Sequence, residues 1–285
     1  PIQLRAMAIG LADVGWFPGL QDPTGESTWP PAVVLMAHLS SSRGRALLCG
    51  RNVLELGAGN GELAKIVAAM RPRKLLATDL PHRIEQLGDV LHGTCAEAAA
   101  LPWGDQKAVE MLCRRHFGAP HADVVLISDC LYTNWVEDSA TALAVTVAAA
   151  LGERSGQAHD GTALLAYVPR SSALEEQFFK CTAQLGLRKL PLPKPDVYLL
   201  KSMEAAREFE EEELHAVLLL ELSRSCSRKP VPGLRAEREK MALAAFVGHG
   251  EVARQLSETP SSFPLNTTPS KFPLSVNCEA PDENM

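Results

Sequence analysis

The chain has 285 residues, of which 46% are hydrophobic and 22% charged, so it can bury a sizeable core and is neither disordered nor fibrous as a whole. Its 28 basic and 34 acidic side chains give a formal net charge of −6. That balance argues against a protein that mainly grips nucleic-acid backbone, which needs a basic face. It fits a small-molecule site, or a partner that offers a basic side chain.

Cysteine spacing argues against a metal site. None of the seven cysteines forms a C-x-x-C pair, and the two short pairs, His92 with Cys95 and Cys113 with His116, would have to be brought together to bind zinc. We therefore expect no metal, and free thiols in a reducing compartment, the cytoplasm or alternatively the nucleus. No apolar run reaches the roughly 18–20 residues of a membrane helix, and the apolar stretch 6–12 is too short for a signal peptide, so we expect no membrane contact.

The first regular elements are expected after an irregular start. Glycines and prolines interrupt residues 1–28, which we interpret as an N-terminal extension. Pro30 and Pro31 can then open a helix, because proline suits a first helical turn. Residues 52–56 (NVLEL) form a short apolar run that ends on glycines, which predicts a buried strand. Residues 62–70 carry apolar side chains at i, i+3, i+4 and i+7, which predicts a helix.

Two further apolar runs each end in an acid. Residues 74–78 (KLLAT) precede Asp79, and residues 122–128 (ADVVLIS) precede Asp129; both runs are predicted strands. Further along we expect a helix over 137–151, a strand over 162–168 and a helix over 173–185. Strands that alternate with helices indicate a parallel sheet covered on both faces.

The C-terminal part is less regular. Residues 186–190 are expected to begin an edge strand, the glutamates of 208–213 a solvated turn, and residues 215–222 either a strand or a buried helical turn. Residues 257–285 are too polar to fold alone. The expected organisation is an extension over 1–28, one domain over 29–223, a helical extension over 224–256 and a disordered tail over 257–285.

The glycine-rich segment 53–61 (VLELGAGNG) carries the chemistry. Glycines between a strand and a helix let the backbone approach a ligand closely, because no Cβ intervenes. A dinucleotide fingerprint would need G-x-G-x-x-G, but after Gly57 and Gly59 the third place is taken by Glu62, whose charge would repel a pyrophosphate. A P-loop is excluded because no G-K-[S/T] occurs. The remaining pattern, E-x-G-x-G-x-G, leaves Glu55 to meet a positive group.

In this pattern the chain resembles the class I (seven-β-strand) S-adenosylmethionine-dependent methyltransferases. The resemblance implies a Rossmann-like α/β fold with a seven-stranded, mostly parallel sheet and helices on both faces. It also implies that Gly57, Ala58 and Gly59 lie at the methionine end of S-adenosylmethionine. Asp79, 22 residues after Gly57, matches the acid that accepts hydrogen bonds from both ribose hydroxyls.

Three further segments resemble the eukaryotic methyltransferase-like protein-lysine methyltransferases: 24–32 (TGESTWPPA), 101–104 (LPWG) and 128–132 (SDCLY). The resemblance implies cofactor contacts from three side chains, with Trp29 over the site, Trp103 on the adenine and Ser128 beside the cofactor. It implies that Asp129 and Tyr132 line the acceptor entrance, where Asp129 would hold the incoming amine by charge and Tyr132 by its hydroxyl or ring face. Members of that group modify chaperones, the valosin-containing AAA ATPase and translation elongation factors.

Several alternatives stay open. The two tryptophans could be ordinary core aromatics and Asp129 a helix cap. Cys130 is expected to be a small buried residue and not a nucleophile. The N-P-P-Y motif of amide and adenine methyltransferases is replaced by SDCL from Ser128, which counts against those acceptors. Lysine is the expected acceptor on a monomeric enzyme, with histidine not distinguished from it. The other functions considered are a small-molecule methyltransferase and a non-catalytic scaffold.

Overall fold

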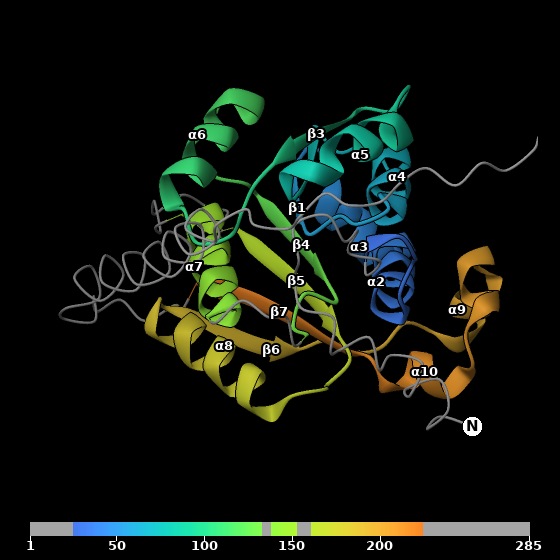
Figure 1. The fold of residues 1–285 in the computed structure, drawn as a ribbon. Coiled ribbons are helices and arrows are strands. Elements are labelled where there is room, and N and C mark those ends of the chain that lie inside the picture. The colour runs from blue at the N-terminus through green and yellow to red at the C-terminus, as the bar shows by residue number, and fades with distance from the viewer. Residues whose placement is uncertain (1–24, 133–137, 153–160, 225–285) are drawn as a thin grey trace, which may run out of the picture.

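A single seven-stranded sheet forms the centre of the protein (Figure 1). The computed structural model describes residues 25–132, 138–152 and 161–224. The strands are β1 (Asn52–Leu56), β2 (Lys74–Asp79), β3 (Ala96–Ala100), β4 (Val124–Ser128), β5 (Thr162–Tyr167), β6 (Leu187–Pro191) and β7 (Leu218–Arg224). Their order is β3-β2-β1-β4-β5-β7-β6; the first five are parallel, and β7 runs antiparallel between β5 and β6. The expected seven-stranded, mostly parallel sheet is confirmed.

Helices cover both faces of the sheet (Figure 1). On one face α6, α7 and α8 pack over a core that includes Val109, Leu143 and Phe178. On the other face α2, α4 and α5 pack over a second core that includes Leu35 and Val67. The bounds are α2 (Pro30–Ser40), α3 (Ser42–Leu48), α4 (Glu62–Ala69), η3 (Pro81–Arg83), α5 (Ile84–Leu91), α6 (Gln106–Phe117), α7 (Ser139–Leu151) and α8 (Ser172–Gln184). None of the helices in the described ranges is long and apolar enough to cross a membrane.

The helix α2 is buried along almost its whole length. Pro30 occupies its first turn, as expected, and nine of its eleven residues are buried. A helix that is apolar all round has no solvent face, so it must be enclosed by other elements. Here the sheet lies on one side, and the helices of the β6–β7 connection cover another part of it (Figure 1). The α2 N-terminus is therefore held rigidly, and with it Trp29, the residue that caps it.

β6 runs in the same direction as β5, because both pair antiparallel with β7. The connection from β6 to β7 therefore starts at the end of the sheet where the carboxyl ends of the parallel strands lie. It contains α9 (Val197–Ser202), η4 (Glu204–Glu208) and α10 (Glu211–Ala216). The expected solvated turn over 208–213 is wrong in its local structure. Glu210 and Glu213 form a reciprocal capping box that starts α10, which satisfies two backbone N–H groups at the helix end.

Several boundaries differ from the expected ones. The last strand begins at Leu218 and continues to Arg224, one residue beyond the expected domain end. Residues 1–24 of the expected N-terminal extension, the expected helical extension beyond Arg224 and the tail over 257–285 lie outside the described residues and stay predictions. Helices α3, α5, α6, α9 and α10 and strand β3 were not expected from local patterns.

Candidate active site

The polar residues identified from the sequence meet where β1 and β4 lie side by side. From β1 the chain continues toward β2 and β3, whereas β4 leads to β5 on the other side. In open parallel sheets, ligands bind in the crevice outside the carboxyl ends of strands at such a switch point. The glycine turn follows β1 here, and Asp129 follows β4. Fold topology therefore brings these two segments to one edge.

The glycine turn needs glycine for two reasons. Gly57, Gly59 and Gly61 have φ values of +68°, +55° and +79°, which side chains rarely adopt. A Cβ built on Gly57 would also lie 2.8 Å from Cys130 Sγ and 3.4 Å from Trp103 Cζ2. The turn is thus a cradle made of backbone, with side chains packed directly against it.

The acid that ends β2 is hydrogen bonded to the same turn. The Gly59 N–H donates to Asp79 Oδ2 at 2.7 Å, and the Leu80 N–H donates to Asp79 Oδ1 at 2.7 Å. A carboxylate has about four lone-pair positions, so each oxygen can still accept a hydroxyl. Asp79 is only half-buried, which leaves it accessible to a ligand beside the turn.

Buried beneath the turn lies Glu55, which is 1% exposed. Its Oε2 is a buried polar atom without a hydrogen-bond partner among the described residues. Burial, followed by the negative charge of Asp79, raises the pKa of Glu55 to about 8. A positively charged ligand group nearby would favour the ionised form of this carboxyl.

These residues fit S-adenosylmethionine. The turn presents bare backbone at Gly57 and Gly59, and Asp79 offers acceptors for hydroxyls. The unpartnered oxygen of Glu55 suits a positively charged group. Cofactor-binding roles for Glu55, Gly57, Ala58, Gly59 and Asp79 stay predictions, and the structure places all five within one turn and the strand ends beside it.

The two tryptophans lie on different elements: Trp103 follows β3, and Trp29 precedes α2. Trp103 is half-buried, and its ring lies against the Gly57 position. The next residue ties this loop to α7, because the Gly104 N–H donates to Thr146 Oγ1 at 2.8 Å. Trp29 is half-buried, and its carbonyl accepts the first backbone hydrogen bond of α2, from the Ala32 N–H at 2.9 Å. Trp103 also packs against the core that α6, α7 and α8 cover.

A short segment that precedes α2 crosses the glycine turn, which the sequence did not predict. The side-chain amide of Asn60 donates to Thr28 Oγ1 at 2.9 Å. A Cβ on Gly59 would lie 3.4 Å from the backbone of Gly25, and a Cβ on Gly25 would lie 2.3 Å from Arg83 Nη2. Residues 25–29 therefore lie between the turn and Arg83, although we expected residues up to 28 to be an extension.

At the end of β4, Asp129 already has a cationic partner. Arg170 Nη1 donates to Asp129 Oδ1 at 2.7 Å, and Nη2 donates to Oδ2 at 2.9 Å. Arg170 follows β5, so the rule that polar residues after adjacent parallel strands meet at one edge could have identified it. Ser128 and Tyr132 are half-buried on either side of Asp129; Tyr132 is the last described residue before the gap at 133–137.

Cys130 is buried between these groups. Its Sγ lies 3.4 Å from the carbonyl oxygens of Leu56 and Ser128, to which the thiol donates. Burial, then the negative charges of Asp129, Asp79 and Glu55, raises the pKa of this thiol well above its ordinary value. A thiolate is therefore strongly disfavoured, which agrees with the expectation that Cys130 is not a nucleophile.

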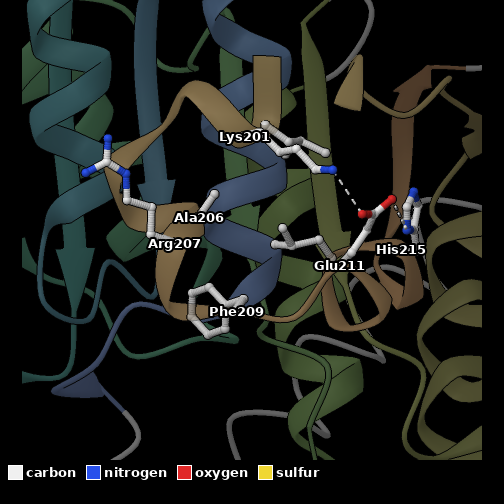
Figure 2. A pocket seen from close by; sticks show the side chains of 8 residues that line it. Lys201, Ala206, Arg207, Phe209, Glu211 and His215 are labelled. Carbon is white, nitrogen blue, oxygen red and sulfur yellow. Dashed lines mark ion pairs between the residues drawn. The ribbon is translucent and has the colours of Figure 1, made fainter. Parts of the chain in front are cut away.

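A separate hollow of about 220 Å³ lies on the β6–β7 connection (Figure 2). Lys201 and Glu211 form an ion pair of 3.1 Å at its rim, and His215 Nδ1 lies 3.9 Å from Glu211. Its lining comes from α9, η4 and α10, and contains none of the residues predicted to bind the cofactor. We therefore assign the chemistry to the switch point and not to this hollow.

Comparison with known proteins is consistent with this site. The model of a family described as lysine methyltransferase matches residues 19–184. Protein-lysine methyltransferase METTL21E of Mus musculus is 29% identical over 117 residues, which are 40% of this chain and 48% of that protein. EEF1A lysine methyltransferase 3 of Mus musculus is 35% identical over 88 residues, 29% of this chain and 34% of that protein. The match thus spans less than half the length of either relative.

Solved structures are more distant. Magnesium protoporphyrin IX methyltransferase of Synechocystis PCC 6803, with bound SAM, aligns at a TM-score of 0.44 and 14% identity, over 74% of this chain and 88% of that chain. Such a remote likeness adds nothing to the strand order itself. The family model, in contrast, matches more than half of the chain. On that match, and with the glycine turn and its acid at the switch point, the protein belongs to the lysine methyltransferase family.

Proposed function

We propose that this protein transfers methyl groups from S-adenosylmethionine to a lysine side chain of another protein. The observation that carries the proposal is the Gly59 N–H to Asp79 hydrogen bond, which joins the glycine turn and the ribose-binding candidate into one site. When bound, the cofactor supplies a methyl group on a positively charged sulfur: a bond forms from the amine nitrogen to the methyl carbon while the carbon–sulfur bond breaks, and its electron pair stays on sulfur.

In this proposal the residues at the carboxyl ends of β1 and β2 bind the cofactor. Asp79 accepts hydroxyls, and each hydrogen bond to such a charged acceptor is worth about 1.5–3 kcal/mol. Trp103, whose ring lies against Gly57, and Trp29, at the start of α2, exclude water from the bound cofactor in this proposal. Ser128, at the end of β4, lies next to this half of the site.

The acceptor half falls to Asp129 and Tyr132. A lysine must attack as a neutral amine, and with a reference pKa near 10.4 the loss of its proton to water at pH 7 costs about 4–5 kcal/mol. A cation held nearby lowers that cost by like-charge repulsion. Alignment of the amine supplies the rest, since positioning alone can contribute several kcal/mol to a displacement.

The acceptor protein is proposed from the relatives. One of them is named for EEF1A, which makes EEF1A the first purified acceptor to test. Chaperones and AAA ATPases, which the family resemblance implies as acceptors, follow. We also propose that the enzyme works in the cytoplasm as a monomer. The free thiols of Cys49, Cys95, Cys113, Cys130 and Cys181 support a reducing compartment. Cell fractionation and size-exclusion chromatography test these two points.

Tritium labelling tests the reaction. The full chain is incubated with methyl-labelled S-adenosylmethionine and a cell lysate, and labelled bands are hydrolysed to identify the methylated amino acid. We expect methyl-lysine in a discrete band, lost with Asp79→Ala and strongly reduced with Asp129→Ala. Label in an acid-soluble, protease-resistant product would replace the proposal with a small-molecule methyltransferase. A chain that binds no S-adenosylmethionine by calorimetry and labels nothing would be a scaffold.

A further inference from the structure

Asp129, the carboxylate proposed to receive the lysine, is hydrogen bonded by a residue that follows β5. Arg170, three residues beyond β5, makes two nearly parallel hydrogen bonds to Asp129, of 2.7 and 2.9 Å. The Asp129 side chain is 10% exposed and that of Arg170 is 29% exposed, so the pair is largely shielded from water. The Asp129 N–H also donates to Ala166 O at 2.8 Å. Both the backbone and the carboxylate of Asp129 are thus fixed by one neighbouring segment.

We propose that Arg170 is a positioning residue that cancels the charge of Asp129 and fixes its free lone pairs, so that the acceptor lysine is received as a neutral amine. The inference rests on the proposed function and deepens it. It changes the expected role of Asp129, from an attracting charge to an oriented hydrogen-bond acceptor.

Electrostatics is the first reason. An opposite charge within about 4–6 Å stabilises the charged form of a titrating group by 1–3 pKa units. An unpaired Asp129 would therefore stabilise the lysine ammonium, which cannot attack. A guanidinium carries a positive charge, and that of Arg170 lies in direct contact with Asp129, so it offsets this effect.

Geometry is the second reason. A carboxylate has about four lone-pair positions, and the guanidinium fork uses two. The other two stay available and lie in a plane that the fork fixes. An amine N–H donated to one of them leaves the nitrogen lone pair free for attack. A lysine in place of Arg170 would keep the charge but would not fix that plane.

Other acidic groups on the adjoining elements also affect the equilibrium between the lysine ammonium and the neutral amine. Glu55 and Asp79 lie at the ends of β1 and β2, and their negative charges, like that of Asp129, raise the pKa of the Cys130 thiol. From α8, Glu175 accepts a hydrogen bond from the Tyr167 hydroxyl at 3.1 Å. All of these groups are acidic. Without Arg170, the charge of Asp129 would add to that of Asp79 and favour the ammonium further.

The test compares Arg170→Met and Arg170→Lys with the natural chain. Initial labelling rates of the lysate band are measured from pH 6.5 to 9.5, and the affinity for S-adenosylmethionine is measured by calorimetry. For Arg170→Met we expect the midpoint of the pH–rate curve to rise by about one pH unit or more. For Arg170→Lys we expect an unchanged midpoint with a lower plateau. Unchanged cofactor affinity in both variants would show that they fold and that the effect is on the acceptor side.

A second set of variants tests whether Arg170 acts through its partner. In an Asp129→Asn background, Arg170→Met should no longer move the midpoint, because no carboxylate charge is left to offset. A lower plateau with an unmoved midpoint in Arg170→Met, or an equal shift in both backgrounds, overturns the inference alone. If Arg170→Met does not fold, an Arg170→Lys curve displaced from the natural one does the same. No labelled protein with the natural chain at any pH overturns the proposed function and the inference with it.

Discussion

Replacing Gly57 by alanine tests the close packing at the glycine turn. The new Cβ would lie 2.8 Å from Cys130 Sγ and 3.4 Å from Trp103 Cζ2, at a backbone φ of +68°. Gly50 offers a matched control, since it has the same φ of +68° but no atom within 4 Å of its Cβ position. The two substitutions share the backbone strain and differ in the space around the methyl group.

The expected losses of stability follow from these two terms. Left-handed backbone costs a residue with a Cβ about 1–2 kcal/mol, which both variants lose. Overpacking of a well-filled site adds about 1–3 kcal/mol, and only Gly57→Ala incurs it. We therefore expect Gly57→Ala to lose about 2–5 kcal/mol of unfolding free energy, against about 1–2 kcal/mol for Gly50→Ala.

Urea denaturation measures both losses, and calorimetry with S-adenosylmethionine follows the site. Gly57→Ala should also weaken cofactor binding, whereas Gly50→Ala should not. A further Cys130→Ala substitution removes the sulfur that the new methyl group meets, so it should restore part of the stability of Gly57→Ala. Equal losses for the two alanine variants would refute the argument that close approach, and not backbone conformation alone, requires Gly57.

Three other predictions concern the same site. Asp79→Ala should lower S-adenosylmethionine affinity by about 10- to 100-fold or more in calorimetry. The control Asp105→Ala removes the α6 N-cap bond to the Ala108 N–H and should cost about 1 kcal/mol of stability without changing that affinity. Equal affinities of the two variants would contradict the ribose role of Asp79. The pKa of Glu55 is about 8 in the folded protein, against an ordinary value of 4.5, so the cofactor-free protein should lose stability, on the order of a few kcal/mol, as pH rises from 4.5 to 8. Glu55→Gln should abolish this fall, which urea midpoints measure. A parallel fall in the variant would contradict the burial effect. Maleimide treatment of the folded protein should modify the exposed Cys49 and spare Cys130, because Cys130 is buried and burial raises the pKa of its thiol. Peptide mass spectrometry measures both, and rapid modification of Cys130 in the folded protein would contradict this.

Local pattern was sufficient for the elements that carry strong hydrophobic periodicity. The strand at Asn52–Leu56 has the expected bounds, because five buried residues end on glycines that no strand continues through. Helix α4 follows from the apolar spacing after the turn. Strand β3 was not predicted, because its sequence AEAAA lacks β-branched and aromatic residues. It is a strand because β2 pairs with it along its whole length.

Local patterns identify the residues at the strand ends: the glycines after β1, Asp79 at the end of β2 and Asp129 after β4. Each of these residues directly follows the apolar run that predicts its strand, so short-range physics is enough to find it. Which strand ends face one another depends on the fold of the whole chain. Arg170 meets Asp129 from 41 residues away, and Cys130 lies against Gly57, because strand order places β4 between β1 and β5. Strand order follows from the packing of both cores together, and no short segment encodes it, so the partner of Asp129 emerged only with the fold.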